Sequence, residues 1–384
     1  MKTFLIIASS PTSVLNFRSK LLEIIGRLDH EVHVIIPFTE SFYEQKEKLN
    51  ELGFHVHKLS MQRTGINPFY DIQTLAQLFF IINKVKPNTV LSYTIKPVIY
   101  GSIAAKIAGV KNIYSLITGL GYAFISLENP NHKLTSLQKV VFNLYKMALF
   151  CSNKVIFQNS DDAELFEKMN LVNNKKINIV NGSGVDLSHY NYDLTILEEY
   201  APEQPIKFLM LGRIIGDKGI REYVAAATEL KKKYGTKVIF QLGGGLDTNP
   251  TAIQKKELDE WVSTGVIEYL GKLKDVRPTI TNSHVFILPS YREGTSRSIL
   301  EAMSIGRPIV TTNVAGCRQL VEVGRNGYLA EAKSVQSLVD AIEKMINVSS
   351  KKLIQMGIYS RKIVEDKYDV HKVNEHMLTI MDIK

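Results

Sequence analysis

The sequence predicts an α/β fold made of two doubly wound parallel sheets in tandem. Strand-like apolar runs alternate with amphipathic helical segments, and this alternation stops in a polar segment and then restarts. The length of 384 residues accommodates two domains, and 45% hydrophobic and 22% charged residues are globular values. We expect a Rossmann-like domain at 1–190, a linker at 191–205, a second Rossmann-like domain at 206–365 and a C-terminal helix at 366–384 that packs back toward the first domain.

The first domain opens with a buried apolar strand, and a helix follows in which apolar residues recur at helical spacing. Gly109 is suited to end a later helix, because glycine is common just past a helix C-terminus. The expected strands are 3–8, 31–37, 55–59, 89–91, 113–117, 154–158 and 177–180, and the expected helices are 17–28, 42–52, 71–85, 98–108, 132–150 and 159–169.

The second domain repeats this order. Gly306 is placed to end a short helix between two apolar strands. The expected strands are 207–211, 237–242, 267–270, 285–288 and 308–312, and the expected helices are 219–234, 252–263, 276–282, 298–305, 334–347, 351–365 and 370–381.

Cysteine content, hydropathy and the N-terminus predict a cytoplasmic protein. Two cysteines are too few for a disulfide framework or a structural zinc site. No apolar run is long enough to span a membrane, and Met1-Lys2-Thr3 leads into a strand without a cleavable signal pattern.

The net charge of +9 is unevenly distributed, with nine lysines and one acid, Glu128, between residues 72 and 160. A solvated basic face and a surface for anionic lipid headgroups or a diphosphate acceptor both fit this pattern. No nucleic-acid-binding motif is visible, so no nucleic-acid partner is expected.

Residues 285–319 carry the most specific chemistry. A strand is followed by a polar loop, a helix and a second strand, and doubly wound sheets bind ligands beyond the carboxyl end of such a strand. Glu293 lies in the loop and Glu301 lies one turn into the helix, with seven residues between them. The backbone N–H groups at 294–297 lie at a helix N-terminus, where they suit an anion.

The run EGTSRSILEAMSIGRPIV, which contains both glutamates, resembles the signature of retaining, family-4 type glycosyltransferases of GT-B fold. Loops 93–101 and 116–124 resemble those of the bacterial subgroup that builds capsule, O-antigen and other lipid-linked glycans. The resemblance covers nearly the whole chain. It implies an acceptor-binding first domain, a nucleotide-sugar-binding second domain and a cleft between them.

A second motif, GRIIGDKG at 212–219, leads from a strand end to a helix start. A lysine at a helix start opposes the helix dipole, which favours an anion nearby, and two surface cations are the alternative. In the family that the chain resembles, this motif holds the donor pyrophosphate. The resemblance therefore implies that Arg213 and Lys218 bind the diphosphate and that Gly212 allows close backbone approach.

The resemblance also implies that Glu301 binds the ribose hydroxyls and that Glu293 contacts the donor sugar. An ordinary glutamate of a first helical turn is the alternative for Glu301, and a surface arginine is the alternative for Arg297. The expected catalytic residues are Arg213, Lys218 and Glu293. The expected donor-binding residues are Gly212, Gly243, Gly271, Gly294, Thr295, Ser296, Arg297 and Glu301.

Residues of the acceptor side are expected in loops that follow the first-domain strands. They are Asn16, Arg18, Lys96, Thr118 and Gly119. The loop 9–18 lacks the paired glycines of many family members. Thr118 and Gly119 stand where many relatives carry a histidine, so one familiar catalytic group is missing. A solvated lysine and a contact with an acceptor phosphate both fit Lys96.

The nine histidines show no metal-binding spacing, and the cleft loops carry no Asp-x-Asp motif, so we expect neither a catalytic metal nor a cofactor. We interpret the chain as a metal-independent hexosyltransferase that uses a UDP-sugar, with an N-acetylhexosaminyl unit favoured. The expected acceptor is a polyprenyl-diphosphate-linked or other glycan of capsule or lipopolysaccharide assembly. We expect peripheral binding to the inner face of the cell membrane. The alternatives are a UDP-sugar epimerase of the same fold and a non-catalytic partner subunit.

Overall fold

The computed structural model describes the chain except for residues 63–66, 121–123, 125–133, 192–203 and 248–250. The described residues form two compact units. Unit 1 comprises Met1–Ser183 with His371–Lys384, and unit 2 comprises Gly184–Val370. Most of the expected linker lies outside the described residues.

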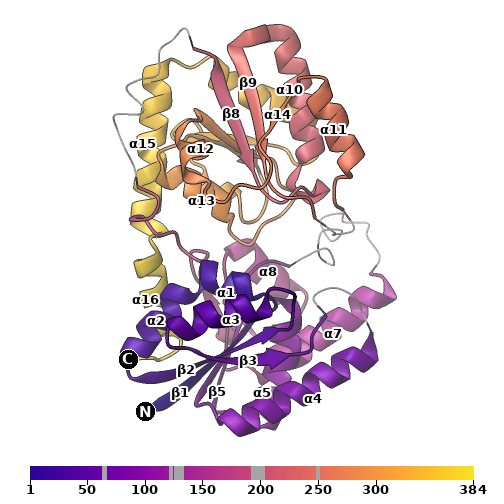
Figure 1. Cartoon of the computed structure of the whole chain (residues 1–384), viewed down its shortest axis with the longest axis vertical. Helices are drawn as coiled ribbons and strands as arrows, with labels where there is room; N and C mark the ends of the chain where they lie inside the picture. Colours follow the sequence, from indigo (N-terminus) through magenta and orange to yellow (C-terminus); the bar gives the residue numbers. More distant parts are fainter. Residues whose placement is uncertain (63–66, 121–123, 125–133, 192–203, 248–250) are drawn as a thin grey trace. The chain divides into compact units, whose positions relative to one another are not determined.

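Unit 1 contains a seven-stranded sheet in the order β3-β2-β1-β4-β5-β6-β7, and all neighbouring strands are parallel (Figure 1). The strands are β1 (Lys2–Ile7), β2 (His30–Pro37), β3 (His55–Leu59), β4 (Thr89–Tyr93), β5 (Asn112–Ile117), β6 (Lys154–Phe157) and β7 (Ile177–Ile179). Phe4 and Ile6 of β1 enter one hydrophobic core, and Leu5 and Ile7 enter another. Both faces of this sheet are therefore covered, as the apolar strands predict.

The helices of unit 1 differ from expectation mainly near Arg18. The expected helix 17–28 spans Ser19–Arg27, and a further helix at Pro11–Phe17 precedes it in the expected loop 9–18. The two helices meet at Arg18, whose φ of −132° is not helical. Pro11 begins the first of them, at a position where its missing N–H group costs nothing. The helices are α1 (Pro11–Phe17), α2 (Ser19–Arg27), α3 (Phe42–Glu51), α4 (Pro68–Val85), the π-helix η1 (Pro97–Gly101), α5 (Ser102–Ile107), α7 (Ser136–Cys151), α8 (Ser160–Lys168), the 3-10 helix η3 (Asn174–Lys176) and α16 (Val370–Ile380).

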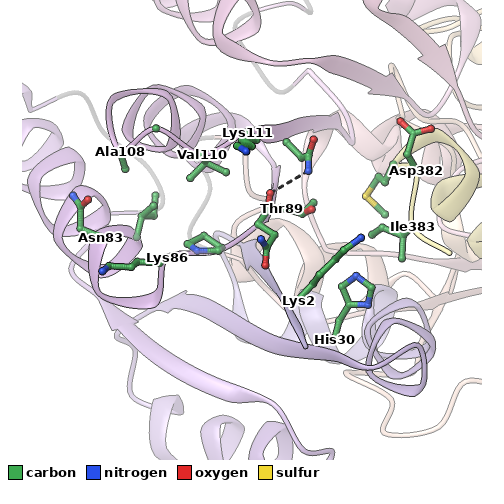
Figure 2. A pocket seen from close by; sticks show the side chains of 16 residues that line it. Lys2, His30, Asn83, Lys86, Thr89, Ala108, Val110, Lys111, Asp382 and Ile383 are labelled. Atoms are coloured by element: carbon green, nitrogen blue, oxygen red, sulfur yellow. Dashed lines mark hydrogen bonds between the residues drawn. The ribbon is translucent and has the colours of Figure 1, made fainter.

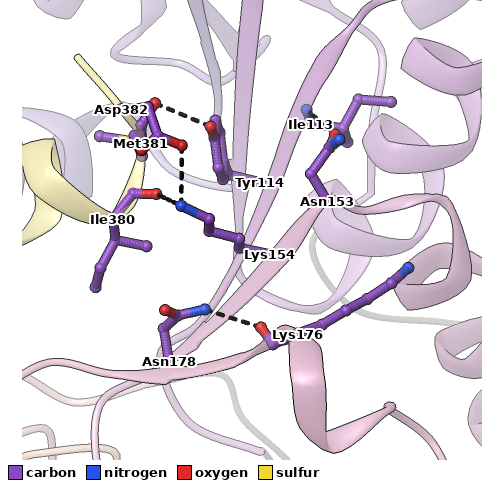
Figure 3. Close-up of polar contacts among 9 residues, drawn as sticks. All are labelled: Ile113, Tyr114, Asn153, Lys154, Lys176, Asn178, Ile380, Met381 and Asp382. Carbon is purple, nitrogen blue, oxygen red and sulfur yellow. Dashed lines mark hydrogen bonds and ion pairs between the residues drawn. The ribbon is translucent and has the colours of Figure 1, made fainter.

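Polar contacts attach the C-terminal segment to the sheet of unit 1 (Figure 3). The Tyr114 hydroxyl on β5 donates to the carbonyl oxygen of Met381 at 2.9 Å. Lys154 on β6 donates to the carbonyl oxygen of Ile380 at 2.6 Å and forms an ion pair with Asp382 at 2.9 Å. Apolar side chains of the same segment join the core that contains α2. The last residues of the chain thus belong to unit 1.

Unit 2 contains a six-stranded parallel sheet in the order β10-β9-β8-β11-β12-β13. The strands are β8 (Ile206–Leu211), β9 (Val238–Gly243), β10 (Glu268–Tyr269), β11 (Val285–Leu288), β12 (Ile309–Thr312) and β13 (Gly327–Ala330). The two doubly wound parallel sheets confirm the predicted fold class. β13 was not expected, because its four residues begin with glycine and include only a short apolar run.

The helices of unit 2 pack in pairs, with α10 against α14 and α13 against α15. They are η4 (Gly216–Lys218), α10 (Ile220–Tyr234), η5 (Gly235–Lys237), α11 (Lys255–Ser263), α12 (Arg277–Thr281), α13 (Arg297–Ser304), η6 (Arg318–Leu320), α14 (Val335–Ile346) and α15 (Ser350–Lys367). α11 begins three residues later than expected, because Ala252 forms a β-bridge with Ile215 instead.

Candidate functional site

The loops that follow β8 and β11 meet in unit 2, and a glycine makes this contact possible. Gly219 lies between η4 and α10 with φ +73°, in the left-handed region. A Cβ atom on Gly219 would lie 2.1 Å from the carbonyl oxygen of Pro289. The backbone N–H of Tyr291 donates to the carbonyl oxygen of Asp217 at 2.9 Å across the same junction. The start of α10 is therefore fixed against the loop that carries Glu293.

Lys218 and Glu293 form an ion pair at this junction. The hydroxyl of Ser290 donates a second hydrogen bond, of 2.7 Å, to the same Oε1 atom of Glu293. The Lys218 and Glu293 side chains are only 19% and 15% exposed, so solvent screens the pair weakly. An ammonium group beside a helix start favours negative charge, and the Glu293 carboxylate supplies that charge in this structure.

Arg213 is the second cation expected to bind diphosphate, and it is much more accessible. Its guanidinium pairs with Asp247 at 3.1 Å, yet 48% of its side chain remains exposed. The same loop carries Lys218, whose stem passes Gly212, since a Cβ on Gly212 would lie 3.8 Å from Lys218 Cγ. The loop after β8 thus carries one largely buried cation, Lys218, and one solvent-accessible cation, Arg213.

Backbone hydrogen bonds connect the strand ends that carry the expected donor-binding glycines. The N–H of Gly212 donates to Gly243 O at 3.1 Å, and the N–H of Gly244 donates to Gly271 O at 2.8 Å. A Cβ on Gly244 would lie 1.8 Å from the carbonyl oxygen of Gly212. The ends of β8, β9 and β10 therefore form a glycine-rich backbone surface, which allows a ligand to approach the main chain closely.

The loop between Glu293 and α13 is bonded to the segment after β12. The N–H of Glu293 donates to Ala315 O at 3.0 Å, and the N–H of Ser296 donates to Gly316 O at 3.1 Å. A Cβ on Gly316 would lie 2.2 Å from the carbonyl oxygen of Glu293, so a side chain there would separate the two segments. The Ser296 amide is thus already engaged with Gly316, and its expected contact with sugar or phosphate stays a prediction. Gly294 and Thr295 lie between these two anchored residues.

Arg297 and Glu301 form an ion pair of 3.1 Å within α13. Arg297 also donates to the carbonyl oxygen of Gly184 at 2.7 Å, and the two charged side chains are only 22% and 16% exposed. Burial, and then the charge and hydrogen bond of Glu301, raise the pKa of Tyr190. These contacts contradict the surface alternative for Arg297, whose side chain is largely buried.

Three partners in unit 2 were not expected from the sequence: Asp247, Ser290 and Tyr190. Asp247 ends the glycine-rich run after β9, and Ser290 precedes Glu293 by three residues, so both lay close to recognised motifs. Tyr190 lies in a polar segment, and no spacing rule relates it to Glu301 more than a hundred residues later.

In unit 1, loops at the carboxyl ends of β1 and β4 meet through hydroxyl groups. The Thr94 hydroxyl donates to the Ser9 hydroxyl at 2.8 Å, and the hydroxyls of Ser13 and Tyr93 lie 2.7 Å apart. Arg18 is almost fully buried, with its guanidinium carbon 5.5 Å from the centre of the Tyr93 ring.

Gln158 connects two of the expected acceptor-side residues. With its amide oriented to satisfy its neighbours, it accepts from Arg18 Nη2 at 3.3 Å and donates to Thr118 O at 3.3 Å. Gly119 follows with φ +138°, a conformation that favours glycine. Asn16 is exposed on α1. The structure thus brings Arg18 and Thr118 together through a residue that follows β6.

Lys96 is not a solvated lysine. Its ammonium lies 2.8 Å from the Asp71 carboxylate, and the two side chains are 14% and 13% exposed. Burial, and then a hydrogen bond from its hydroxyl to Asp71, raise the pKa of Tyr100. Lys96 therefore holds η1 against α4 and has its charge matched within unit 1.

A cavity of about 360 Å³ in unit 1 lies at the opposite end of the sheet (Figure 2). Its lining includes Lys2, His30, Thr89 and Asn112, which are the first residues of β1, β2, β4 and β5. The expected acceptor-side residues follow the carboxyl ends of the strands, so this cavity is not part of the candidate site.

Two family models match the chain. One, described as group 1 glycosyl transferases, matches residues 205–347, and one described as glycosyl transferase 4-like matches residues 9–159. Together they cover more than half of the chain. The chain belongs to the family-4 type glycosyltransferases. The family resemblance predicted from the run EGTSRSILEAMSIGRPIV is therefore confirmed, and the chain is a transferase enzyme.

Similar proteins include a Campylobacter jejuni N,N'-diacetylbacillosaminyl-diphospho-undecaprenol alpha-1,3-N-acetylgalactosaminyltransferase, which is 29% identical over 87% of this chain and 86% of its own. The capsular polysaccharide glycosyltransferase CapM of Staphylococcus aureus is 26% identical over 93% of this chain and 90% of its own. An Escherichia coli UDP-Gal:alpha-D-GlcNAc-diphosphoundecaprenol alpha-1,3-galactosyltransferase is 27% identical over 75% of each chain. Neither the epimerase nor the non-catalytic subunit receives support from these relatives.

Solved glycosyltransferase structures share the fold of this member. HepE of Anabaena in complex with UDP and glucose matches with a TM-score of 0.76 and 17% identity, over 100% of both chains. Sucrose-phosphate synthase of Thermosynechococcus elongatus matches with a TM-score of 0.78 and 15% identity, over 99% of this chain and 98% of its own. These likenesses confirm the predicted GT-B fold.

Proposed function

We propose that this glycosyltransferase moves a hexosyl unit, with N-acetylhexosaminyl favoured, from a UDP-sugar to a polyprenyl-diphosphate-linked glycan. We further propose that it retains the anomeric configuration and needs no metal. The names of two relatives support the acceptor class, since both specify a sugar linked to diphospho-undecaprenol. One of them also specifies a UDP-sugar donor, and the Anabaena neighbour was solved with UDP.

The observation that carries the proposal is the ion pair of Lys218 and Glu293 beside the start of α10. In the transfer, the bond between C1 of the sugar and the diphosphate oxygen breaks, and its electron pair leaves with UDP. The acceptor hydroxyl forms the new C1–O bond and releases its proton to the leaving diphosphate. Fixed cations that stabilise the growing negative charge lower the barrier to this step. Arg213 and Lys218 are the cations that the loop after β8 presents.

The ion pair of Lys218 and Glu293 is expected to open when the donor binds. A diphosphate that reaches Lys218 replaces the carboxylate as its partner, and Glu293 is then free to accept hydrogen bonds from the donor sugar. Arg297 keeps Glu301 oriented at the other end of the loop, where its carboxylate suits ribose hydroxyls as carboxylates do in dinucleotide-binding folds.

For the acceptor side, we propose that the loops around Arg18, Thr118 and Gly119 face the lipid-linked glycan. Asn16 is accessible on the same connection after β1. Hydroxyl and amide groups dominate these loops, and such groups suit sugar hydroxyls. Lys96 contributes by positioning its loop, because Asp71 already matches its charge.

Helices α4, α5 and α7 support peripheral binding to the anionic inner face of the cell membrane. Phe80, Ile107 and Phe150 are exposed large apolar side chains on these helices, and α5 packs against both α4 and α7. The same helices carry Lys84, Lys106, Lys139 and Lys146. Exposed aromatic and aliphatic side chains beside lysines favour the interface of an anionic bilayer. No helix among the described residues has the length and apolarity that crossing a bilayer requires.

A donor screen tests the proposed reaction. The purified chain is incubated with UDP-GalNAc, UDP-GlcNAc, UDP-Gal or UDP-Glc, with and without an undecaprenyl-diphosphate-linked monosaccharide, and UDP release is measured. We expect rapid release with one donor, dependent on the acceptor. Equal release with and without acceptor from every donor would contradict transfer to a lipid-linked glycan.

Membrane binding is tested separately by co-sedimentation with vesicles. The protein should pellet with vesicles that contain phosphatidylglycerol and remain in solution with neutral vesicles, and salt should release it because screening weakens surface electrostatics. The paired variant Phe80→Ser/Phe150→Ser should pellet less. Sedimentation that is independent of lipid charge would contradict the basic-face assignment.

A further inference from the structure

Four side chains of β2 and β3 gather on one face of the unit 1 sheet, and we call them the β2–β3 cluster: Glu31, His33, His55 and His57. The parallel register pairs His33 with His55. Residues two apart in a strand share a face, so Glu31 lies beside His33 and His57 lies beside His55. No local sequence spacing relates the two strands, and the histidines therefore appear scattered along the chain.

Three atoms of this cluster converge. Oε1 of Glu31 lies 3.2 Å from Nε2 of His33 and 3.3 Å from Nε2 of His55. All three atoms lie within 4.8 Å of one another. Ligand atoms at tetrahedral zinc, with bonds of about 2.0–2.1 Å, are separated by roughly 3.3 Å. Two of the separations in the cluster already have this value.

The fourth member of the cluster, His57, contacts the ring of His33. Nδ1 of His33 lies 2.8 Å from Nε2 of His57, a hydrogen bond in which His33 donates when its proton is on Nδ1. This contact holds the His33 ring in place whichever of its two nitrogen atoms carries the proton.

His33 is about nine-tenths buried, and its Nε2 atom lies 3.2 Å from Oε1 of Glu31. With the ring proton on Nδ1, the lone pair of Nε2 is directed toward the Glu31 carboxylate. Two lone-pair-bearing atoms that face each other at 3.2 Å repel unless a proton or a cation lies between them. A metal ion bound to both removes this conflict.

We propose that Glu31, His33 and His55 form a binding site for a divalent transition metal of the Zn²⁺ class. Two imidazoles and one carboxylate with an open fourth position are a common zinc ligand set. His57 is a positioning residue that fixes the His33 ring, as hydrogen-bonded partners of metal-binding histidines do. The site is accessible, because His55 is 59% exposed.

The position of the site assigns it a role apart from sugar transfer. His33 and His55 lie in the first part of their strands, whereas the acceptor-side loops follow the carboxyl ends. A metal bound there joins the edge strand β3 to β2. The positive charges of Lys84 and Lys46, which act on His57, oppose a cation, so we expect weaker binding than at a closed structural zinc site.

The test is a titration of the full chain, stripped with a chelator and carrying no histidine tag. Zn²⁺ binding is followed by calorimetry, and Co²⁺ binding is followed by visible absorption, which reports tetrahedral coordination. We expect one ion per chain. His55→Gln changes a half-exposed side chain, which spares the fold, and should lower Zn²⁺ affinity at least tenfold, as should Glu31→Gln. His57→Gln should lower it by about 10–100-fold.

His376→Gln, at an exposed position outside the cluster, should bind as the native chain does. Thermal unfolding provides a second readout, because a ligand that binds only the folded state raises the unfolding temperature. Zn²⁺ should raise it in the native chain and in His376→Gln but not in His55→Gln. Equal titrations of the native chain and His55→Gln, including no binding by either, would overturn the proposal.

Discussion

The loops at the carboxyl ends of the two sheets are built from different chemistry. In unit 2, two ion pairs lie among close backbone contacts, Lys218 with Glu293 and Arg213 with Asp247. In unit 1, hydroxyl and amide groups are prominent, and the charge of Lys96 is matched by Asp71 in the first turn of α4. A nucleotide diphosphate requires fixed cations, whereas a glycan acceptor can be held by neutral groups. This contrast supports the proposal that unit 2 stabilises the charge that develops during transfer.

The largest effect is expected from the two cations of unit 2. Lys218→Ala and Arg213→Ala should each lower kcat/KM by about 10²–10³, the effect of removing one group from a preorganised anion site. Initial rates of UDP release measure this loss. Lys255→Ala, which removes an exposed lysine paired with Asp259 on α11, serves as the control.

Circular dichroism and the unfolding temperature should show that both variants remain folded. Near-native rates for both variants would remove the basis for the comparison, because unit 2 would then supply no essential charge.

The second effect concerns the backbone of unit 2. Gly244→Ala places a Cβ 1.8 Å from the carbonyl oxygen of Gly212, so one of the two strand ends must move. Backbone strain of this kind costs about 1–3 kcal/mol, and we expect UDP affinity to fall about tenfold or more. Calorimetric titration with UDP measures it.

The neighbouring glycine offers a matched control. A Cβ on Gly245 would meet only the Lys272 side chain, at 3.5 Å or more, so Gly245→Ala should bind UDP as the native chain does. Equal losses of UDP affinity in both variants would contradict this explanation. They would mean that any side chain in this loop impairs binding, and that the close approach of Gly244 to Gly212 is not the cause.

The third effect concerns Lys96 of unit 1. Its charge is expected to stabilise the fold through Asp71 and not to bind substrate. Lys96→Met leaves Asp71 largely buried without its partner, and breaking such a pair costs about 3 kcal/mol of unfolding free energy. The KM for the acceptor should change little. Lys96→Met combined with Asp71→Asn should recover most of the stability, because the remaining amide is neutral and still accepts from Tyr100. Urea unfolding measures both variants, and Lys106→Met, at an exposed position, is the control.

A large rise in the acceptor KM that persists in the stable double variant would instead assign Lys96 to an acceptor phosphate. Unit 1 would then also supply charge to the reaction.

The sequence predicted unit 2 more completely than unit 1 for a physical reason. Arg213, Lys218 and Glu293 lie in loops between a strand and a helix, and the sheet order of a doubly wound fold brings such loops together. The pairing of Asp247 with Arg213 and the contact of Tyr190 with Glu301 depend on how separate loops pack, and no local pattern encodes that packing. Ser296 shows the same limit, since its amide is occupied by a carbonyl from the segment after β12.

In unit 1, the elements were predicted, but their register was not. His33 and His55 become neighbours only because β2 and β3 pair with one particular alignment. The helix α1 was missed because it has only seven residues and begins within a run of serine, proline and threonine, a composition typical of loops. Periodicity thus predicts elements, whereas register and loop packing decide which side chains meet.

The smallest expected effect concerns His284, which lies at the amino end of the unit 2 sheet, away from the candidate site. His284 precedes β11, and its Nδ1 accepts the backbone N–H of Lys207 at 2.8 Å. Burial, and then the positive charges of Arg307 and Lys207, lower the pKa of His284 to about 4. The unfolded chain therefore binds more protons than the folded chain between pH 6.5 and 4, so stability is lost as the pH falls through this window. Between pH 7 and pH 5, protonation of His284 in the unfolded chain is expected to lower the free energy of unfolding by about 2 kcal/mol.

His284→Asn supplies an acceptor that does not titrate, so the unfolding free energy should depend less steeply on pH below 6.5, while turnover at pH 7.5 stays near native. Urea unfolding at several pH values gives the slope. If the variant and the native chain give parallel curves, the folded protein already accommodates a protonated His284. A loss of turnover at pH 7.5 would show that the two ends of the unit 2 sheet are coupled. The charged loops would then depend on the packing beneath them as well as on their own ion pairs.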